Sequence, residues 1–273
     1  MKSRVPLVAV NGVLIVAAGM TVFPLLWMLS VSLMPSGSSS VFPPPLWPDH
    51  PTLANYRELF AQQQLGRYFV NSLIVATGAT LCSLVFNGLA GYAFAKLRFA
   101  GRQRLMKVLL AGLLIPAQVT MIPLFGMMKA LGLVNTYAGA IVPAAAGIFG
   151  IFLVRQYALS IPDELIDAAR IDGAGEFRIF RSIIALLLVP ILVTLGVFTF
   201  LGTWNDFMWP LIVLSDRDLQ TLPVALAGMS REHVQDVEMT MAGSVVTVVP
   251  VLILFLALQR QYIRGILMGS VKG

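Results

Sequence analysis

The sequence predicts an all-α protein that crosses a membrane six times. The first observation is composition, because 58% of the 273 residues are hydrophobic and only 12% are charged, whereas soluble domains average about 25% charged residues. The second is that the apolar residues gather into stretches long enough to cross a bilayer core of roughly 30 Å as helix. The third is that the charges fall between these stretches. We expect a single transmembrane domain over residues 1–273.

Six stretches have the length of membrane-spanning helices. In chain order they are Leu7–Met34, Phe69–Ala95, Leu105–Met128, Tyr137–Val154, Ser182–Thr203 and Gly243–Leu258. The first is too long for the apolar region of a signal peptide, so we expect a retained anchor. Prolines within the spans predict kinks, which membrane helices tolerate. Small residues such as Gly88, Gly91, Gly147 and Gly150 allow helices to approach closely.

The basic residues give the spans an orientation. An even number of spans places both termini on one side, and that side carries fourteen of the 19 Lys and Arg residues. Cytoplasmic loops carry such an excess, so both termini are expected in the cytoplasm. The outer loops are then about 35–68 and 204–242. Trp27 and Trp47 flank the first, and Trp204 and Trp209 begin the second, as expected of interfacial anchors.

The spans contain almost no ionisable side chains. Only Lys107, near the end of one span, is charged, whereas ion-coupled carriers place such groups mid-membrane. The chain has no G-x-x-x-x-G-K-[ST] loop, so we expect no ATP hydrolysis by this chain. Cys82, His50 and His233 stand apart, without ligand spacing, so no metal site is expected. The basic excess follows topology, so nucleic acid is not an expected partner. Transport here is either passive or driven by a partner.

Amides lie in or beside the spans, where ionisable groups are missing. Gln118 and Asn205 are candidates for lining a path for a neutral, hydroxyl-rich solute, while Asn71 and Asn87 are further polar residues of this kind. The alternative is that each forms an ordinary interhelical hydrogen bond. Both interpretations stay open at this point.

One polar segment, Ser160–Phe177, interrupts the apolar chain between the fourth and fifth spans. We expect Ser160 to cap a helix from about Ile161 to Asp172, and Gly173 to end it. Leu165, Ile166 and Ala169 would form its apolar strip. A surface-bound amphipathic helix is one interpretation. The small residues around Gly173 favour a second one, docking of a soluble protein.

The same segment also carries a resemblance. The run DAARIDGAGEFRIF resembles the EAA–DGA coupling motif of ABC importer permeases. Other segments look like the six-span subunit of maltose-type carbohydrate permeases: NSLIVAT, GYAFAKLRFAGR, IPAQVTMIPLF, GLVNTYAGAIVP, FGIFLVRQYALSIPDEL, FTFLGTWNDFMWPLIVL, TLPVAL and GSVKG. They cover nearly the whole chain in order. The resemblance implies a type I ABC importer permease fold with a cytoplasmic coupling helix in the loop of about 160–181.

The motif can be carried over residue by residue. Asp167, Ala168 and Ala169 occupy the E-A-A positions, and Asp172, Gly173 and Ala174 the D-G-A positions. The ATPase-coupling set implied by the resemblance is Glu164, Asp167, Ala168, Ala169, Asp172, Gly173, Ala174, Phe177 and Phe180. Two positions depart from the family pattern. Asp167 replaces the usual Glu, with Glu164 nearby to compensate, and Leu186 replaces the first Pro, which predicts a smaller bend in the fifth span.

The resemblance further implies partners and localisation. A second permease subunit would complete a heterodimer, two cytoplasmic ABC ATPase subunits would bind ATP and Mg, and an extracytoplasmic binding protein would deliver the solute. The chain itself would need no cofactor and would lie in a bacterial cytoplasmic (inner) membrane. A sugar or oligosaccharide is the expected solute, with a polar non-sugar such as glycerol 3-phosphate as the alternative. A stand-alone channel or secondary carrier and a membrane-embedded enzyme are the other classes considered.

Overall fold

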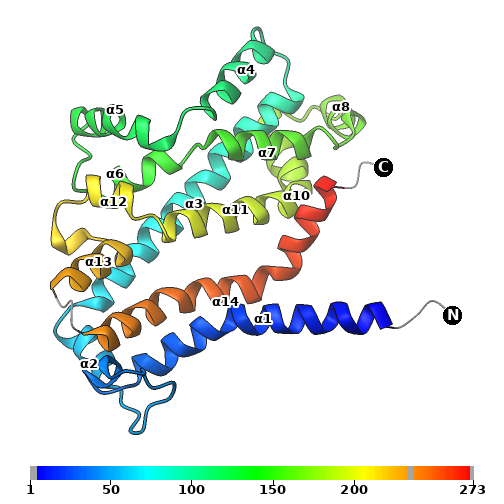
Figure 1. The fold of residues 1–273 in the computed structure, drawn as a ribbon. Coiled ribbons are helices and arrows are strands. Elements are labelled where there is room, and N and C mark those ends of the chain that lie inside the picture. Colours follow the sequence, from blue (N-terminus) through cyan, green and yellow to red (C-terminus); the bar gives the residue numbers. More distant parts are fainter. Residues whose placement is uncertain (1–4, 233–235, 271–273) are drawn as a thin grey trace. The chain divides into compact units, whose positions relative to one another are not determined.

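The computed structural model describes residues 5–232 and 236–270, and all regular elements in these ranges are helical (Figure 1). They divide into two compact units. The first contains the described residues up to Arg67 together with Ala225–Pro250, and the second contains Tyr68–Val224 and the described residues from Val251 onward. The two units are described separately below.

The predicted all-α, six-span fold is confirmed. Three single helices are long and apolar enough to cross a membrane, namely α1 (Val5–Ser32), α3 (Leu65–Lys96) and α14 (Val237–Ser270). Three bent pairs complete the set if each pair is one span: α4 (Arg102–Gly112) with α5 (Ala117–Ala130), α6 (Tyr137–Ile141) and η2 (Val142–Ala144) with α7 (Ile148–Ala158), and the segment from α9 (Glu176–Ile179) to α11 (Val189–Trp204). The six apolar stretches thus correspond to six helical segments.

The third stretch is broken rather than kinked. Its pieces α4 and α5 differ in direction by 107°. Pro116 stands at the break with an extended backbone (ψ 134°) and begins α5 as its N-cap. Proline lacks the N–H that a continuous helix would donate, and its ring clashes with the preceding turn, so α4 ends before it. The break follows from one residue.

The fifth stretch bends more than its sequence suggests. The pieces Glu176–Leu187 and Val189–Trp204 differ in direction by 79°, so the span is sharply bent although Leu186 stands at the position of the family's first proline. Pro190, in the first turn of α11, donates no backbone hydrogen bond and permits the change of direction at Leu188. A π-helical turn, η3 (Phe180–Ile184), precedes the bend.

In the first unit, acidic residues hold the loop that follows α1. Asp236 accepts a hydrogen bond from the Ser36 hydroxyl (2.9 Å), and Glu238 accepts one from the Ser39 backbone N–H (2.7 Å). Glu238 is completely buried. Asn55 of α2 (Ala54–Ala61) donates to the carbonyls of Ser32 and Met34 at the end of α1. These hydrogen bonds therefore attach the end of α1 and the loop after it to α2 and to the residues at the start of α14.

In the second unit, two tryptophans expected at the membrane interface lie inside the protein. Trp204 is 1% exposed and packs 5.5 Å from Phe69, centroid to centroid. Trp209 lies in α12 (Met208–Val213), and its ring nitrogen donates to the Gly139 carbonyl at 3.0 Å. Because helices of the same unit cover both rings, neither serves as an interfacial anchor.

Asn71 forms an interhelical hydrogen bond, the second of the two interpretations given for the amides. Its amide donates to the carbonyls of Asp218 and Gln220, and its oxygen accepts from the Tyr137 hydroxyl at 2.6 Å. It therefore ties α3 to α6 and to the loop before α13 (Leu222–Glu232).

Candidate functional site

The polar segment between the fourth and fifth spans forms helix α8, Asp163–Ile171. It begins two residues later than the sequence predicts, after Pro162. Ser160 does not cap it, because its hydroxyl donates to the Tyr157 carbonyl (2.7 Å) and so belongs to the end of α7. Asp163 and Glu164 occupy the first turn, where acidic groups complement the helix dipole.

The C-terminal end of α8 confirms the predicted glycine stop. Gly173 has a φ of +77°, a left-handed conformation that glycine adopts without steric cost. Ala174 N–H donates to the Ala169 carbonyl (2.9 Å) and Gly173 N–H to the Arg170 carbonyl (3.0 Å). This pair of hydrogen bonds is a Schellman motif. The chain therefore leaves α8 along a fixed path and enters α9 only a few residues later.

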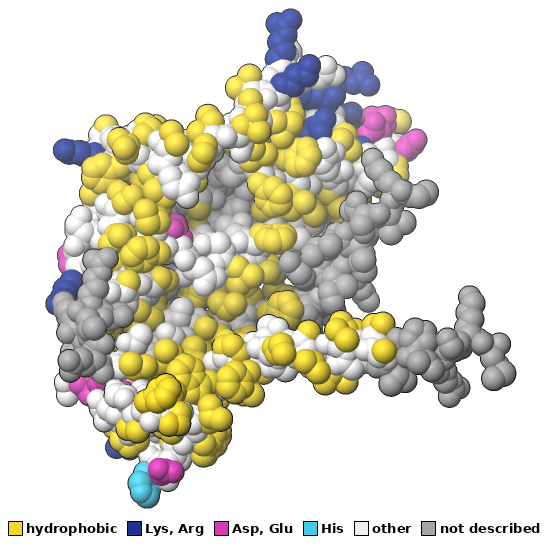
Figure 2. Space-filling view, viewed as in Figure 1, with side chains coloured by type: hydrophobic (Ala, Val, Ile, Leu, Met, Phe, Trp, Pro, Cys, Tyr) yellow, Lys and Arg dark blue, Asp and Glu magenta, His cyan; other side chains and the backbone are white. Residues whose placement is uncertain are grey.

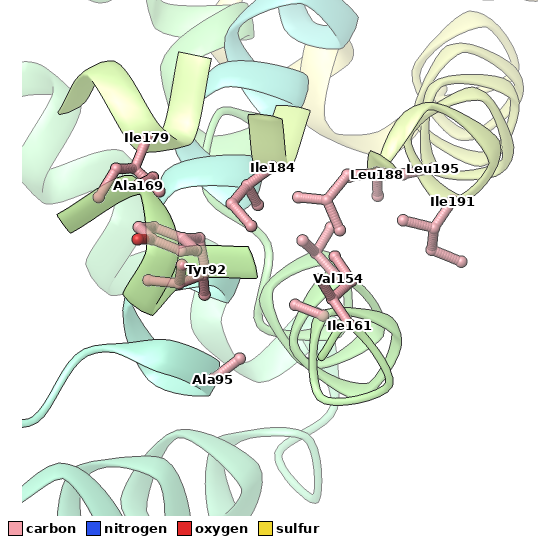
Figure 3. Close-up of a cluster of buried hydrophobic side chains, with 12 residues drawn as sticks. Tyr92, Ala95, Val154, Ile161, Ala169, Ile179, Ile184, Leu188, Ile191 and Leu195 are labelled. Carbon is pink, nitrogen blue, oxygen red and sulfur yellow. The ribbon is translucent and has the colours of Figure 1, made fainter. Parts of the chain in front are cut away.

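One face of α8 is buried in the largest described apolar cluster of the second unit. Ile166 is 2% exposed and Ala169 8% exposed. They pack in one cluster with residues of α3, α7, α9 and α11, among them Tyr92, Ile179 and Leu195 (Figure 3). Leu165, expected in the apolar strip, points away instead and is 45% exposed. Burial of this face fixes which side of α8 remains free.

The residues predicted for coupling divide between these two sides. Glu164, Asp167, Ala168, Asp172, Gly173 and Phe177 are exposed, whereas Ala169 is buried and Ala174 and Phe180 are half-buried. Phe180 packs against Tyr92 at 5.5 Å between ring centroids. Ala169, Ala174 and Phe180 thus support the surface from behind, and the other six lie where another protein can reach them.

Sequence reasoning missed Ile171, the most exposed apolar residue of the segment. Ile171 is 86% exposed, and Phe177 is 69% exposed. The sequence signal for this exposure is an isoleucine between two charged residues, Arg170 and Asp172, at the end of a charged helix. Leu165, Ile171 and Phe177 form what we call the outer apolar set. They are the large apolar side chains that stand exposed between Asp163 and Phe177.

The same segment also carries ion pairs. Lys96, the last residue of α3, donates to Asp163 at 2.6 Å and holds the pKa of that carboxyl below its usual range. Arg170 donates to Glu176 at 2.8 Å and to Asp167 at 3.1 Å, and the Glu176 contact raises the pKa of its guanidinium. Ion pairs therefore lie on the same segment as these exposed apolar residues.

Figure 2 shows where charges gather near this site. Lys and Arg side chains collect over α4, with Asp and Glu side chains beside them over α8. The basic group includes Arg98, Arg102 and Arg104, which line a surface cavity between α3 and α4. Arg102 also donates to the Leu97 carbonyl (2.9 Å), which caps the end of α3.

The two candidate path residues lie elsewhere in the second unit. Gln118 is exposed in the first turn of α5, and Asn205 is exposed at the end of α11. The Asn205 amide donates to the Leu201 carbonyl at 2.8 Å, which caps that helix. Asn87 is 1% exposed and donates to the Ser83 hydroxyl four residues earlier in the same helix, α3. The path role of Gln118 and Asn205 stays a prediction.

Residues 87–267, more than half of the chain and including all of α8, match the family described as binding-protein-dependent transport system inner membrane component. The chain belongs to this family. It is 40% identical over 263 residues to an arabinooligosaccharides transport system permease protein of Halalkalibacterium halodurans, covering 94% of this chain and 93% of that relative. It is 33% identical to a lactose transport system permease protein of Rhizobium radiobacter, covering 100% and 98%.

A solved structure shows the same architecture for another permease. The chain superposes on a subunit of a bacterial ABC transporter involved in the import of the acidic polysaccharide alginate, with a TM-score of 0.83 and 25% identity. The match covers 95% of this chain and 98% of that one. The fold is therefore that of an ABC importer permease, a multi-pass inner-membrane protein.

Proposed function

We propose that this permease is the transmembrane subunit through which an ATP-driven importer takes up a sugar or oligosaccharide. The observation that carries the proposal is the outer apolar set, Leu165 and Ile171 on α8 and Phe177 on α9, which is exposed while Ile166 and Ala169 of α8 are buried. Because this segment resembles the coupling motif of the family, we infer that the surface binds a cytoplasmic ATPase.

The remaining partners follow from the same assignment. Two ATPase subunits bind ATP and Mg, and a second permease subunit completes the path as a heterodimer. An extracytoplasmic binding protein delivers the solute, which agrees with the family description. The side that carries α8 and the basic residues over α4 is cytoplasmic, because positive loops stay inside. Both termini then lie in the cytoplasm.

The proposed solute class rests on relatives and on chemistry. Relatives at 40% and 33% identity are named for arabinooligosaccharides and lactose. The central parts of the six apolar stretches contain no Lys, Arg or His that could bind an anion. This absence from the sequence favours a neutral, hydroxyl-rich solute. Glycerol 3-phosphate transport by the same machinery is the second candidate, and its anionic phosphate makes the two separable in an uptake assay.

The test uses the complete transporter. The chain is co-expressed with the permease, ATPase and binding protein encoded beside it, and the complex is reconstituted in vesicles with ATP inside. Uptake of labelled arabinotriose or lactose, dependent on ATP and competed by the unlabelled sugar, is the expected result. Uptake by the chain alone, without an ATPase, would contradict the proposal.

The docking surface is tested on the same preparation. Ile171→Ser and Phe177→Ser should each lower the amount of ATPase that co-purifies, because each removes exposed apolar contact area. Phe42→Ser is the matched control, since Phe42 is 94% exposed in the loop after α1. Retention of the ATPase by an Ile171→Ser/Phe177→Ser double variant would show that α8 does not carry the contact.

A further inference from the structure

The last turn of α3 reaches the beginning of α8. Lys96 Nζ donates to Asp163 Oδ1 (2.6 Å) and to the Ile161 carbonyl (2.5 Å), while only 6% of its side chain is exposed. The ammonium thus lies between the C-terminal end of one helix and the N-terminal end of another. A cation is favoured at the first and an anion at the second, so both helix dipoles support this pair.

The same helix reaches the segment that follows α8. Tyr92 stands four residues before Lys96, on the same face of α3. Its hydroxyl donates to Glu176 Oε2 at 2.8 Å, and Glu176 Oε1 accepts from Arg170, in the last turn of α8, at 2.8 Å. The Tyr92 ring is 3% exposed within the cluster that covers the inner face of α8 (Figure 3).

These two contacts attach α8 at both of its ends to one rigid element. A helix held at one end by a hydrogen bond can pivot about it, whereas a helix held at two ends follows the body to which it is attached. Side chains 67 and 84 positions apart in sequence make the contacts, so the connecting loops alone do not provide them. The buried face between the two ends supplies the third constraint.

Building on the proposed function, we propose that Lys96 and Tyr92 are positioning residues that lock α8 to α3 and pass its displacement by the ATPase into this membrane-spanning helix. Both side chains are covered, so neither belongs to the surface that an ATPase touches. Their loss should leave docking intact and separate ATP hydrolysis from transport.

The first measurement concerns the attachment itself. Hydrogen exchange is followed by mass spectrometry on the purified chain, without any ATPase. Lys96→Met should accelerate exchange of the first hydrogen-bonded amides of α8, from Ile166 onward, by about tenfold, the factor expected for a lost charge-assisted hydrogen bond. Tyr92→Phe should accelerate exchange of the amides after Asp172. Lys96→Arg should recover most of the protection, and Lys107→Met, at an exposed basic residue of α4, should change nothing.

The second measurement concerns transmission, in the reconstituted transporter. The Lys96→Met/Tyr92→Phe double variant should keep its bound ATPase and its ATP hydrolysis, while sugar imported per ATP falls about tenfold. Unchanged import per ATP, with faster exchange in α8, would overturn the transmission role and leave the proposed function standing. Unchanged exchange would overturn the attachment. Loss of the ATPase would assign both residues to docking instead.

Discussion

Gly91 of α3 and Val154 of α7 lie so close that a Cβ built on the glycine would stand 2.6 Å from the Val154 Cβ. The same Cβ would stand 3.0 Å from the backbone nitrogen of Arg155. Val154 is completely buried in the cluster beneath α8. Glycine therefore sets the distance between these two membrane helices, as small residues do in membrane packing.

Gly91→Ala should destabilise the protein by about 1–3 kcal/mol, because the clash involves atoms next to the backbone and the helices must separate. Thermal unfolding in detergent measures the effect. Val154→Ala should give only partial relief, since alanine keeps the clashing Cβ, whereas Val154→Gly should remove the 2.6 Å clash and leave only the 3.0 Å contact with the Arg155 nitrogen. Gly126→Ala in α5 is the control, with no atom within 4 Å of the added carbon. A Gly91→Ala variant as stable as Gly126→Ala would refute this packing.

Gly173 and Gly175 allow backbone strain to be separated from side-chain bulk. Neither would meet an atom within 4 Å of an added Cβ, but Gly173 has a φ of +77° and Gly175 a φ of −73°. Gly173→Leu should therefore weaken ATPase docking while the six-span fold persists, through strain of about 1–2 kcal/mol in the turn. Gly173→Asn should be milder, because asparagine tolerates this conformation. Co-purification of the ATPase is the measurement, with Gly175→Leu as control. Equal losses at both positions would point to bulk alone.

The Lys96–Asp163 pair should open only in acid. The folded-state pKa of Asp163 is lowered, chiefly by the hydrogen bond from Lys96. The carboxylate therefore supports α8 fully above its ordinary pKa of about 3.9, and this support is lost as the pH falls through the lower folded value. A spin label at Glu164→Cys, in a Cys82→Ala background, should keep its mobility from about pH 8 to 5 and gain mobility only as the pH falls through the lowered pKa of Asp163, below its ordinary value of about 3.9. With Lys96→Met added, the label should be mobile throughout. Release near pH 6 would assign the pair's opening to another group.

Gln118→Ala and Asn205→Ala should alter sugar uptake without loosening the ATPase, since both amides are exposed at helix ends far along the chain from α8. Asn205→Ser is the more selective variant, because the Asn205 amide also caps α11. The measurement is the concentration dependence of uptake for arabinotriose and lactose. Uptake curves identical to the unmutated chain would make both residues structural.

Local patterns in the sequence predict the parts of the site that local forces determine. The glycine stop at Gly173, the acidic first turn of α8 and the six apolar helical segments all depend on neighbouring residues or on composition, and the structure confirms them. The first residue of α8 could not be predicted from local patterns in the same way. Ser160 is a good N-cap by type, yet its hydroxyl bonds to Tyr157, and Lys96 takes the carbonyl of Ile161.

Contacts between distant segments could not be predicted in this way. Nothing near Asp163 indicates that Lys96 will reach it, and nothing near Trp209 indicates that Gly139 will accept its N–H. The size of the bend at Leu188 is likewise not evident from the sequence, because a proline such as Pro190 permits a change of direction but does not set its angle. Helical periodicity gives the faces of each helix, but packing decides which partner each face meets.

The π-helical turn η3, Phe180–Ile184, has a consequence for insertions and deletions. A π-helical turn accommodates one residue more than an α-helical turn. Removing one residue, such as Ser182, would restore regular α-helix and leave Leu188, Ile191 and Leu195 on the face that now lies in the cluster. Removing one residue from within α11 would instead rotate all that follows by about 100°. This turn is therefore the place where the fifth span can lose a residue while its buried face stays in register.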